Sequence, residues 1–156
     1  MNINIVCVGK IKENFYRQAV DEYAKRLGRF CKFSVIEVGE ELLTGESEKQ
    51  IEMVKQREGK RILEKCKGMV VALDLGGKQL TSEEFASTIS QNMTSGVSQI
   101  SFVIGGSYGL SKEVLKETKM SICFGKMTYP HQLMRVILAE QIYRAFMINE
   151  GSVYHK

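Results

Sequence analysis

The chain has 156 residues, of which 44% are hydrophobic and 26% charged, as expected for one globular domain with its own core. No stretch approaches the ~20 consecutive apolar residues of a membrane span, and the first residues enter an apolar run without the basic segment of a signal peptide. We therefore expect a cytoplasmic protein that does not enter a membrane. The net charge of +4 is mild. Its basic excess falls in residues 1–36 and 49–67, where it indicates either solvated helix faces or attraction to a phosphate backbone.

The four cysteines, Cys7, Cys31, Cys66 and Cys123, form no CxxC pair, and neither histidine lies near one of them in the sequence. This spacing argues against a zinc site and against a disulfide framework, so no metal is expected. Cys7 and Cys123 lie in apolar, strand-like runs, where a thiol is typically a small buried hydrophobe.

The first half of the chain alternates between strand and helix patterns. Ser47-x-x-Gln50 is a capping box, which opens a helix that runs to about residue 65. Apolar runs and helical spacing predict the other elements. These are a strand at 2–8, a helix at 14–27 that Gly28 ends, and a strand at 33–38.

The second half repeats the alternation. Thr81-x-x-Glu84 opens a helix that Gly96 closes, and Ser111 caps a short one. Three strands are predicted at 69–73, 100–104 and 121–124, with a turn at 74–78, and a long helix is predicted from about 132 to 149. Strict alternation of this kind favours an α/β fold, with a mostly parallel sheet and helices on both faces, in one domain over residues 1–156.

Glycine-rich loops follow three of these strands, at 73–78, 105–110 and 124–131. Ligands of open α/β sheets bind beyond the carboxyl ends of the strands, and glycine lets the backbone approach a ligand closely. The sharpest loop is Gly105-Gly106-x-x-Gly109. It matches neither the dinucleotide fingerprint nor a P-loop, and by itself it is as well explained by a tight turn before a helix.

The last helix has almost no polar face. A helix that is apolar all round must be covered on all sides, and one sheet covers only one side. We therefore expect a homodimer through this helix, the alternative being burial by neighbouring helices of the same chain. Arg135 and Arg144 project from it on opposite sides, and Glu140 precedes Arg144 by four residues. Each arginine could serve a structural ion pair or RNA binding.

The loop before this helix contains the only proline, Pro130, followed by His131. Proline fixes the chain as it enters the helix, and the histidine is expected to hydrogen-bond near the helix cap. No Ser-His-Asp order, paired carboxylates in one loop or metal-ligand spacing is present, so a hydrolase has little support.

Seven segments, in order along the whole chain, resemble the RlmH (YbeA-like) ribosomal RNA methyltransferases of the SPOUT class. They are Val8-Gly9-Lys10, Glu22-Tyr23-x-Lys25-Arg26-Leu27, Glu58-Gly59-x-Arg61-Ile62-Leu63, Ile104-Gly105-Gly106-x-x-Gly109-Leu110, Lys126-Met127-Thr128-Tyr129-Pro130-His131-Gln132, Arg135-Val136-x-Leu138-x-Glu140-Gln141-x-Tyr143-Arg144-Ala145 and Tyr154-His155-Lys156.

The resemblance implies a SPOUT fold with a C-terminal trefoil knot, a homodimer, and S-adenosylmethionine as the methyl donor. It implies methylation of N3 of pseudouridine 1915 in helix 69 of 23S rRNA, within the assembled ribosome. Position by position, it places the cofactor at Leu73, Gly105, Gly106, Gly109, Phe124, Gly125, Lys126, Met127, Thr128 and Tyr129. It places the target nucleotide at Arg144, Tyr154, His155 and Lys156, facing the cofactor of the other subunit.

The residues are consistent with this chemistry. A cationic group such as Arg144 can stabilise a developing uracil anion, and His155 is the side chain of the tail that titrates near neutrality. Its role as a general base competes with phosphate binding. A free tail is disordered by default, so we expect RNA or a partner subunit to order it. Three alternatives stay open: a related enzyme with another RNA target, an RNA-binding ribosome-associated factor without turnover, and a small nucleotide-binding hydrolase.

Overall fold

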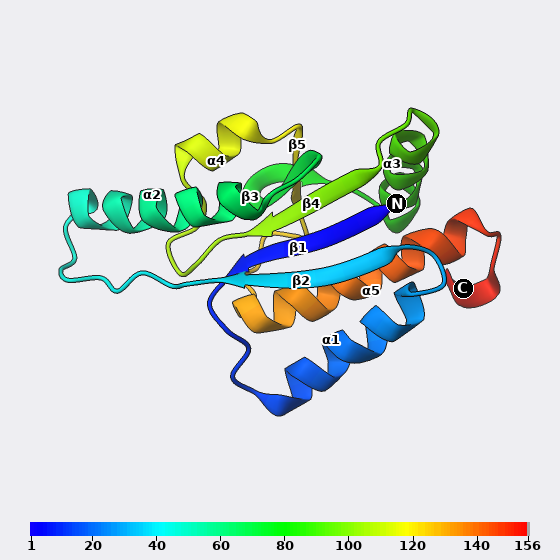
Figure 1. Cartoon of the computed structure of the whole chain (residues 1–156), viewed down its shortest axis with the longest axis horizontal. Helices are drawn as coiled ribbons and strands as arrows, with labels where there is room; N and C mark the ends of the chain where they lie inside the picture. The colour runs from blue at the N-terminus through cyan, green and yellow to red at the C-terminus, as the bar shows by residue number, and fades with distance from the viewer. Residues whose placement is uncertain (156) are drawn as a thin grey trace.

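A computed structural model describes residues 1–155, in which five strands form one sheet (Figure 1). The strand order is β2-β1-β4-β3-β5 and all neighbours are parallel, which confirms the predicted parallel α/β class. The trefoil knot stays a prediction. The strands are β1 (Asn2–Val8), β2 (Lys32–Val38), β3 (Met69–Gln79), β4 (Gln99–Ile104) and β5 (Met120–Cys123).

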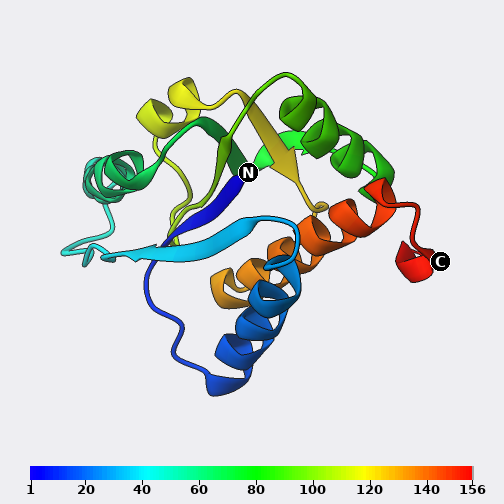
Figure 2. The same cartoon turned by 45° about the vertical axis from the view of Figure 1, so that its right-hand side comes forward.

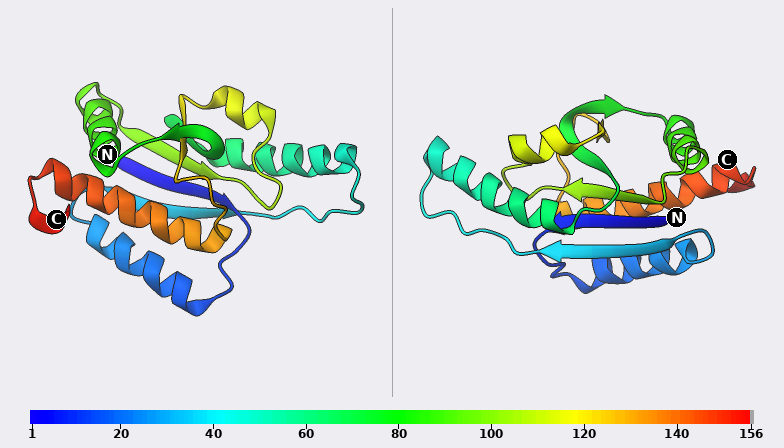
Figure 3. Two further views of the ribbon diagram at one scale, coloured as in Figure 1. Left: turned by 180° about the vertical axis from the view of Figure 1, so that it is seen from behind. Right: turned by 45° about the horizontal axis from the view of Figure 1, so that its top comes forward.

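Helices cover both faces of the sheet, as Figures 2 and 3 show. On one face lie α1 (Asn14–Leu27), α3 (Ser82–Thr94) and α5 (His131–Asn149), and on the other α2 (Glu48–Lys65) and α4 (Lys112–Glu117). Alternate residues of β1 serve the two layers: Ile5 packs under α5 and Val6 under α2. Within residues 1–155, no helix combines the length and apolarity needed to cross a membrane.

The helix starts follow from local capping. Both predicted capping boxes form: Ser47 with Gln50, and Thr81 with Glu84. The hydroxyl of Ser111 accepts from the backbone N–H of Val114 and caps α4. Each cap satisfies N–H groups that a helix leaves without an internal partner, so these boundaries could be predicted from sequence.

The predicted turn at 74–78 is wrong, because β3 continues to Gln79. Leu73 and Lys78 both pair with Ile122 of β5, so the four residues between them bulge out before the strand resumes. Gly77 makes this possible: a Cβ there would lie 2.6 Å from the carbonyl carbon of Ile122. The glycine run therefore marks a bulge with close backbone approach rather than the end of a strand.

Helix α5 is covered by more than the sheet. Aromatic side chains from α1 and from the turn after it pack against it: the rings of Phe30 and Phe146 stack at 5.1 Å, and those of Tyr23 and Tyr143 lie 6.2 Å apart. Helix α3 packs against its other side. Neighbouring helices of the same chain thus bury much of this apolar helix, which was the alternative to a homodimer. A dimer through the helix stays a prediction.

Candidate functional site

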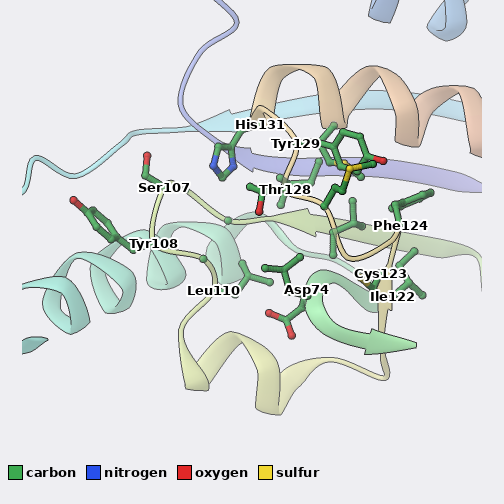
Figure 4. A pocket seen from close by; sticks show the side chains of 18 of the residues that line it. Asp74, Ser107, Tyr108, Leu110, Ile122, Cys123, Phe124, Thr128, Tyr129 and His131 are labelled. Carbon is green, nitrogen blue, oxygen red and sulfur yellow. The ribbon is translucent and has the colours of Figure 1, made fainter. Parts of the chain in front are cut away.

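A cavity of about 550 Å³ lies where β3, β4 and β5 meet their following loops (Figure 4). It is the site that the three glycine-rich loops predict. Nine of the ten predicted cofactor residues line it, and Lys126 is not among the lining residues. The nine are Leu73, Gly105, Gly106, Gly109, Phe124, Gly125, Met127, Thr128 and Tyr129.

Other lining residues were not predicted. Asp74, Tyr108 and Cys123 lie in or beside the three glycine-rich loops, so their positions in the sequence could have identified them. Cys123 is half-buried, and its thiol donates to the carbonyl of Gly125 at 3.0 Å, so it is not the buried hydrophobe we expected. His131, expected to hydrogen-bond near the cap, begins α5 and borders the cavity. Lys55 comes from α2 and reaches the cavity only through tertiary packing.

A buried carboxylate lies behind one of the loops. Glu58 of α2 is 3% exposed; its Oε1 accepts from the backbone N–H of Glu41, and its Oε2 has no partner among the described residues. Burial raises the pKa of this carboxyl group. A Cβ on Gly106 would lie 2.6 Å from Oε2. Residue 106 therefore has no room for a side chain on the side of α2, and it also borders the cavity.

The predicted target-side residues form a second cluster, at the other end of α5. The guanidinium of Arg144 donates to Glu140 Oε1 from Nε at 2.9 Å and from Nη2 at 2.6 Å, and it lies 5.0 Å from the ring centroid of Tyr154. His155 Nε2 lies 2.8 Å from Glu83 Oε1, and its Nδ1 lies 3.5 Å from Arg144 Nη1. Lys156 lies outside the described residues.

The tail is ordered by the chain itself, contrary to our expectation. Val153–His155 form a 3-10 turn against α5. Tyr154 packs edge-on against Tyr143 with ring centroids 5.0 Å apart, and its hydroxyl donates to Glu140 at 3.3 Å. Burial, followed by the charge of Glu140, raises the pKa of Tyr154 to about 12, so it keeps its proton at neutral pH.

The two clusters do not meet within one chain. His131 borders the cavity at the first turn of α5, and Arg144 lies thirteen residues further along the same helix. At 1.5 Å per residue, this separates the two positions by about 20 Å. Met134 also lines the cavity and is still ten residues, or about 15 Å along the helix, from Arg144, so the cavity and the tail cluster are separate features of the single chain.

Comparison with known proteins decides the family. A family model described as "Predicted SPOUT methyltransferase" matches residues 1–155. The chain belongs to this family. It is 54% identical to the "Ribosomal RNA large subunit methyltransferase H" of Clostridium beijerinckii and 55% identical to the protein of that name from Lactiplantibacillus plantarum, over 100% of each chain. A probable methylase family protein from Haemophilus influenzae shares the fold, with a TM-score of 0.53 at 12% identity, over 99% of this chain and 70% of that one.

A SPOUT methyltransferase takes its methyl group from S-adenosylmethionine, as the resemblance implied. The cavity fits such a ligand. Its volume lies within the usual range for small-molecule sites, and Leu73 and Asp74 offer it apolar and carboxylate groups. At Gly109 (φ +82°) and Gly125 (φ +124°), a Cβ would have nothing within 4 Å, so bare backbone borders open space.

Arg135 has a structural role in this SPOUT domain. The side chain is 1% exposed, and it donates to Glu37 Oε1 at 3.1 Å and to the carbonyls of Val8 and Gly9 at 2.7 and 3.0 Å. It joins α5 to the carboxyl end of β1. Of the two roles open from sequence, the structure confirms the structural one for this arginine. Cys7 is fully buried as predicted, and burial raises the pKa of its thiol to about 11.

Proposed function

We propose that this protein methylates large-subunit ribosomal RNA at N3 of a pseudouridine in helix 69 of the assembled ribosome, in the cytoplasm. The observation that carries the proposal is similarity over the entire length of relatives named for methylation of this RNA. The tail motif Tyr154-His155-Lys156 supports it, because this motif belongs to the resemblance.

We further propose that each chain is a single SPOUT domain and that two chains form a homodimer, in which they build the active site together. Because Met134, the cavity-lining residue of α5 nearest to Arg144, is about 15 Å from it along the helix, a site holding both needs the tail cluster of one chain beside the cavity of its partner. Leu133, Val136 and Ile137 remain only partly buried on α5, which leaves apolar surface for such a contact.

In this site, S-adenosylmethionine supplies a methyl group activated by its sulfonium. The residues of the chain must hold the base in line with it and handle the N3 proton. Arg144 is suited to stabilise the negative charge that develops on the base as the proton leaves. To bind it, the guanidinium must turn from Glu140, with which it is paired in the chain alone.

His155 is the proposed acceptor of the N3 proton, and binding of a flanking phosphate is its rival role. With Nε2 hydrogen-bonded to Glu83, the neutral tautomer carries its proton there and leaves the Nδ1 lone pair toward Arg144. The same turn of Arg144 toward the substrate frees Nδ1. One movement thus prepares both the anion-stabilising group and the base.

The test is methyl transfer to unmodified ribosomes. The protein is incubated with ribosomes from a strain lacking this modification and with labelled S-adenosylmethionine, and the labelled nucleotide is mapped by mass spectrometry. We expect label at N3 of one pseudouridine in helix 69. Label elsewhere would identify another RNA target, and absence of label with retained ribosome binding would identify a factor without turnover. Calorimetric binding of ATP without binding of S-adenosylmethionine would favour a hydrolase.

A further inference from the structure

The sheet face that packs against α2 and α4 is apolar at only one end. Near the carboxyl ends of the strands, Val6, Val38 and Val103 form a core with Ile62. Near the amino ends, the same face carries polar side chains instead, and α2 ends before it covers them (Figure 3, right). These side chains are Asn2, Asn4, Lys32, Ser34, Gln99 and Ser101. A parallel sheet normally has both faces covered, so this half is unusual.

A hollow of about 260 Å³ lies over this polar half. It is lined by Asn2, Asn4, Lys32, Ser34, Ile36, Lys65, Lys67 and Gln99. Three ammonium groups therefore surround it, and no carboxylate and no aromatic ring is among its lining residues. We call it the amino-edge hollow.

The floor of the amino-edge hollow is held in place. Ser101 is fully buried and bonds the backbone of Lys67 twice: its hydroxyl accepts from the N–H at 2.9 Å and donates to the carbonyl at 2.8 Å. Asn4 is 9% exposed and accepts from the hydroxyl of Ser34 at 2.7 Å. Ser101 thus anchors the backbone of Lys67, and the Asn4 amide and the Ser34 hydroxyl form polar lining beside the exposed lysine side chains.

This chemistry matches a phosphate backbone. Lysine ammonium groups bind phosphate oxygens, and amide and hydroxyl groups can bond phosphate or ribose. The absence of aromatic rings from the lining removes the usual platform for base stacking. The amino terminus and the turn Val153–His155 lie at this end of the molecule, so the hollow lies at the same end as the tail cluster, on the other face of the sheet (Figure 1).

We propose that the amino-edge hollow binds the sugar-phosphate backbone of the RNA substrate, on nucleotides that flank the one being methylated. This inference rests on the proposed function. The hollow contributes affinity and orientation without reading sequence, and it adds an RNA contact remote from the cofactor cavity of the same chain.

The test is the triple variant Lys32→Ala, Lys65→Ala and Lys67→Ala, assayed by methyl transfer to unmodified ribosomes at several salt concentrations. We expect KM for ribosomes to rise about tenfold or more, and the slope of log affinity against log salt to lose roughly one unit per lysine that contacts a phosphate. The value of kcat and the affinity for S-adenosylmethionine should not change. All three side chains are exposed, so the fold should tolerate the change.

The matched control is Lys112→Ala, Lys116→Ala and Lys119→Ala, which removes the same charge around α4. The triple Lys→Arg variant of the hollow should restore tight binding. An unchanged KM and salt slope in the hollow variant, or an equal loss in the α4 control, would overturn the inference while leaving the proposed function intact. If the wild-type protein labels no ribosomal RNA, the proposed function fails and the inference fails with it.

Discussion

The carboxylate of Glu58 lies where a side chain on Gly106 would project: a Cβ at residue 106 would be 2.6 Å from Oε2. This places a buried acid of α2 directly behind the loop that borders the proposed cofactor cavity. The contact joins two segments that are far apart in the sequence, and it changes what a substitution at Gly106 can report.

We predict that Gly106→Val lowers both thermal stability and the affinity for S-adenosylmethionine. The branched side chain must push against Glu58, which is packed under the loop, so the fold is strained as well as the site. A melting temperature several degrees below wild type, measured by calorimetry, would show this. If the affinity for S-adenosylmethionine falls while the melting temperature stays the same, the valine side chain fills the cavity without straining the contact with Glu58, which contradicts the prediction.

Replacing Glu58 by Gln should stabilise the protein at neutral pH. Burial raises the pKa of this carboxyl group, so the stability of the wild-type protein declines as pH rises through that pKa, whereas the amide does not titrate. Urea unfolding at several pH values should show the gain at pH 7 and its loss below the ordinary carboxyl pKa of 4.5. The control is Glu64→Gln, an exposed acid of the same helix. A gain that does not vary with pH would contradict this explanation.

Thr128→Trp should block the cofactor cavity without unfolding the protein. Thr128 is exposed on the loop that lines the cavity, so an indole there can occupy the space meant for the ligand. We expect the Kd for S-adenosylmethionine to rise at least about tenfold, or 1.4 kcal/mol, by calorimetry. Thr94→Trp, on an exposed position at the end of α3, is the control. Equal binding of S-adenosylmethionine by the two variants would show that the ligand does not bind in this cavity.

Mixing two inactive variants tests whether the site is shared. Arg144→Ala should bind S-adenosylmethionine normally but transfer no methyl group, and Thr128→Trp should fail at binding. Heterodimers of the two contain one intact composite site, so a mixture of equal amounts that exchanges subunits freely should recover about a quarter of wild-type activity. No recovery, with exchange verified by mass spectrometry, would refute a site built from two chains.

Arg135→Ala should lower the free energy of unfolding by about 3 kcal/mol, because it leaves the buried carbonyl of Val8 and the partly buried carbonyl of Gly9 without this donor and Glu37 without its cation. Urea denaturation measures the loss. Arg26→Ala removes an exposed pair with Glu22 and should unfold like wild type. Equal stability of the two variants would show that the burial of Arg135 contributes nothing.

Local signals predicted most of the fold. The capping residues Ser47, Thr81 and Ser111 placed three helix starts, since the groups that they satisfy lie within three residues of them. The bulge in β3 was missed because it depends on pairing with β5, more than forty residues away in the chain. Polar glycine runs predict turns unless a neighbouring strand is there to pair with them.

The candidate site shows the same division. Loops at strand ends marked most of the cavity, because topology fixes where those ends gather. Lys55 of α2 reaches the cavity and Glu58 of α2 lies behind Gly106, and no spacing in the sequence reveals either contact. In the tail, Tyr154 packs against Tyr143, eleven residues earlier in the chain, and sequence alone does not show this contact.

Helix α5 fixes the spacing between the two parts of the proposed active site, because it starts at the cavity with His131 and carries Arg144 towards its far end. Inserting one residue between them would turn Arg144 by about 100° and advance it by about 1.5 Å. An insertion before Glu140 would keep the pair between Arg144 and Glu140, because both residues move together, but it would turn the whole tail cluster away from Glu83 of α3, which contacts His155. The proposed site therefore constrains the length of this helix, and not only the identity of its side chains.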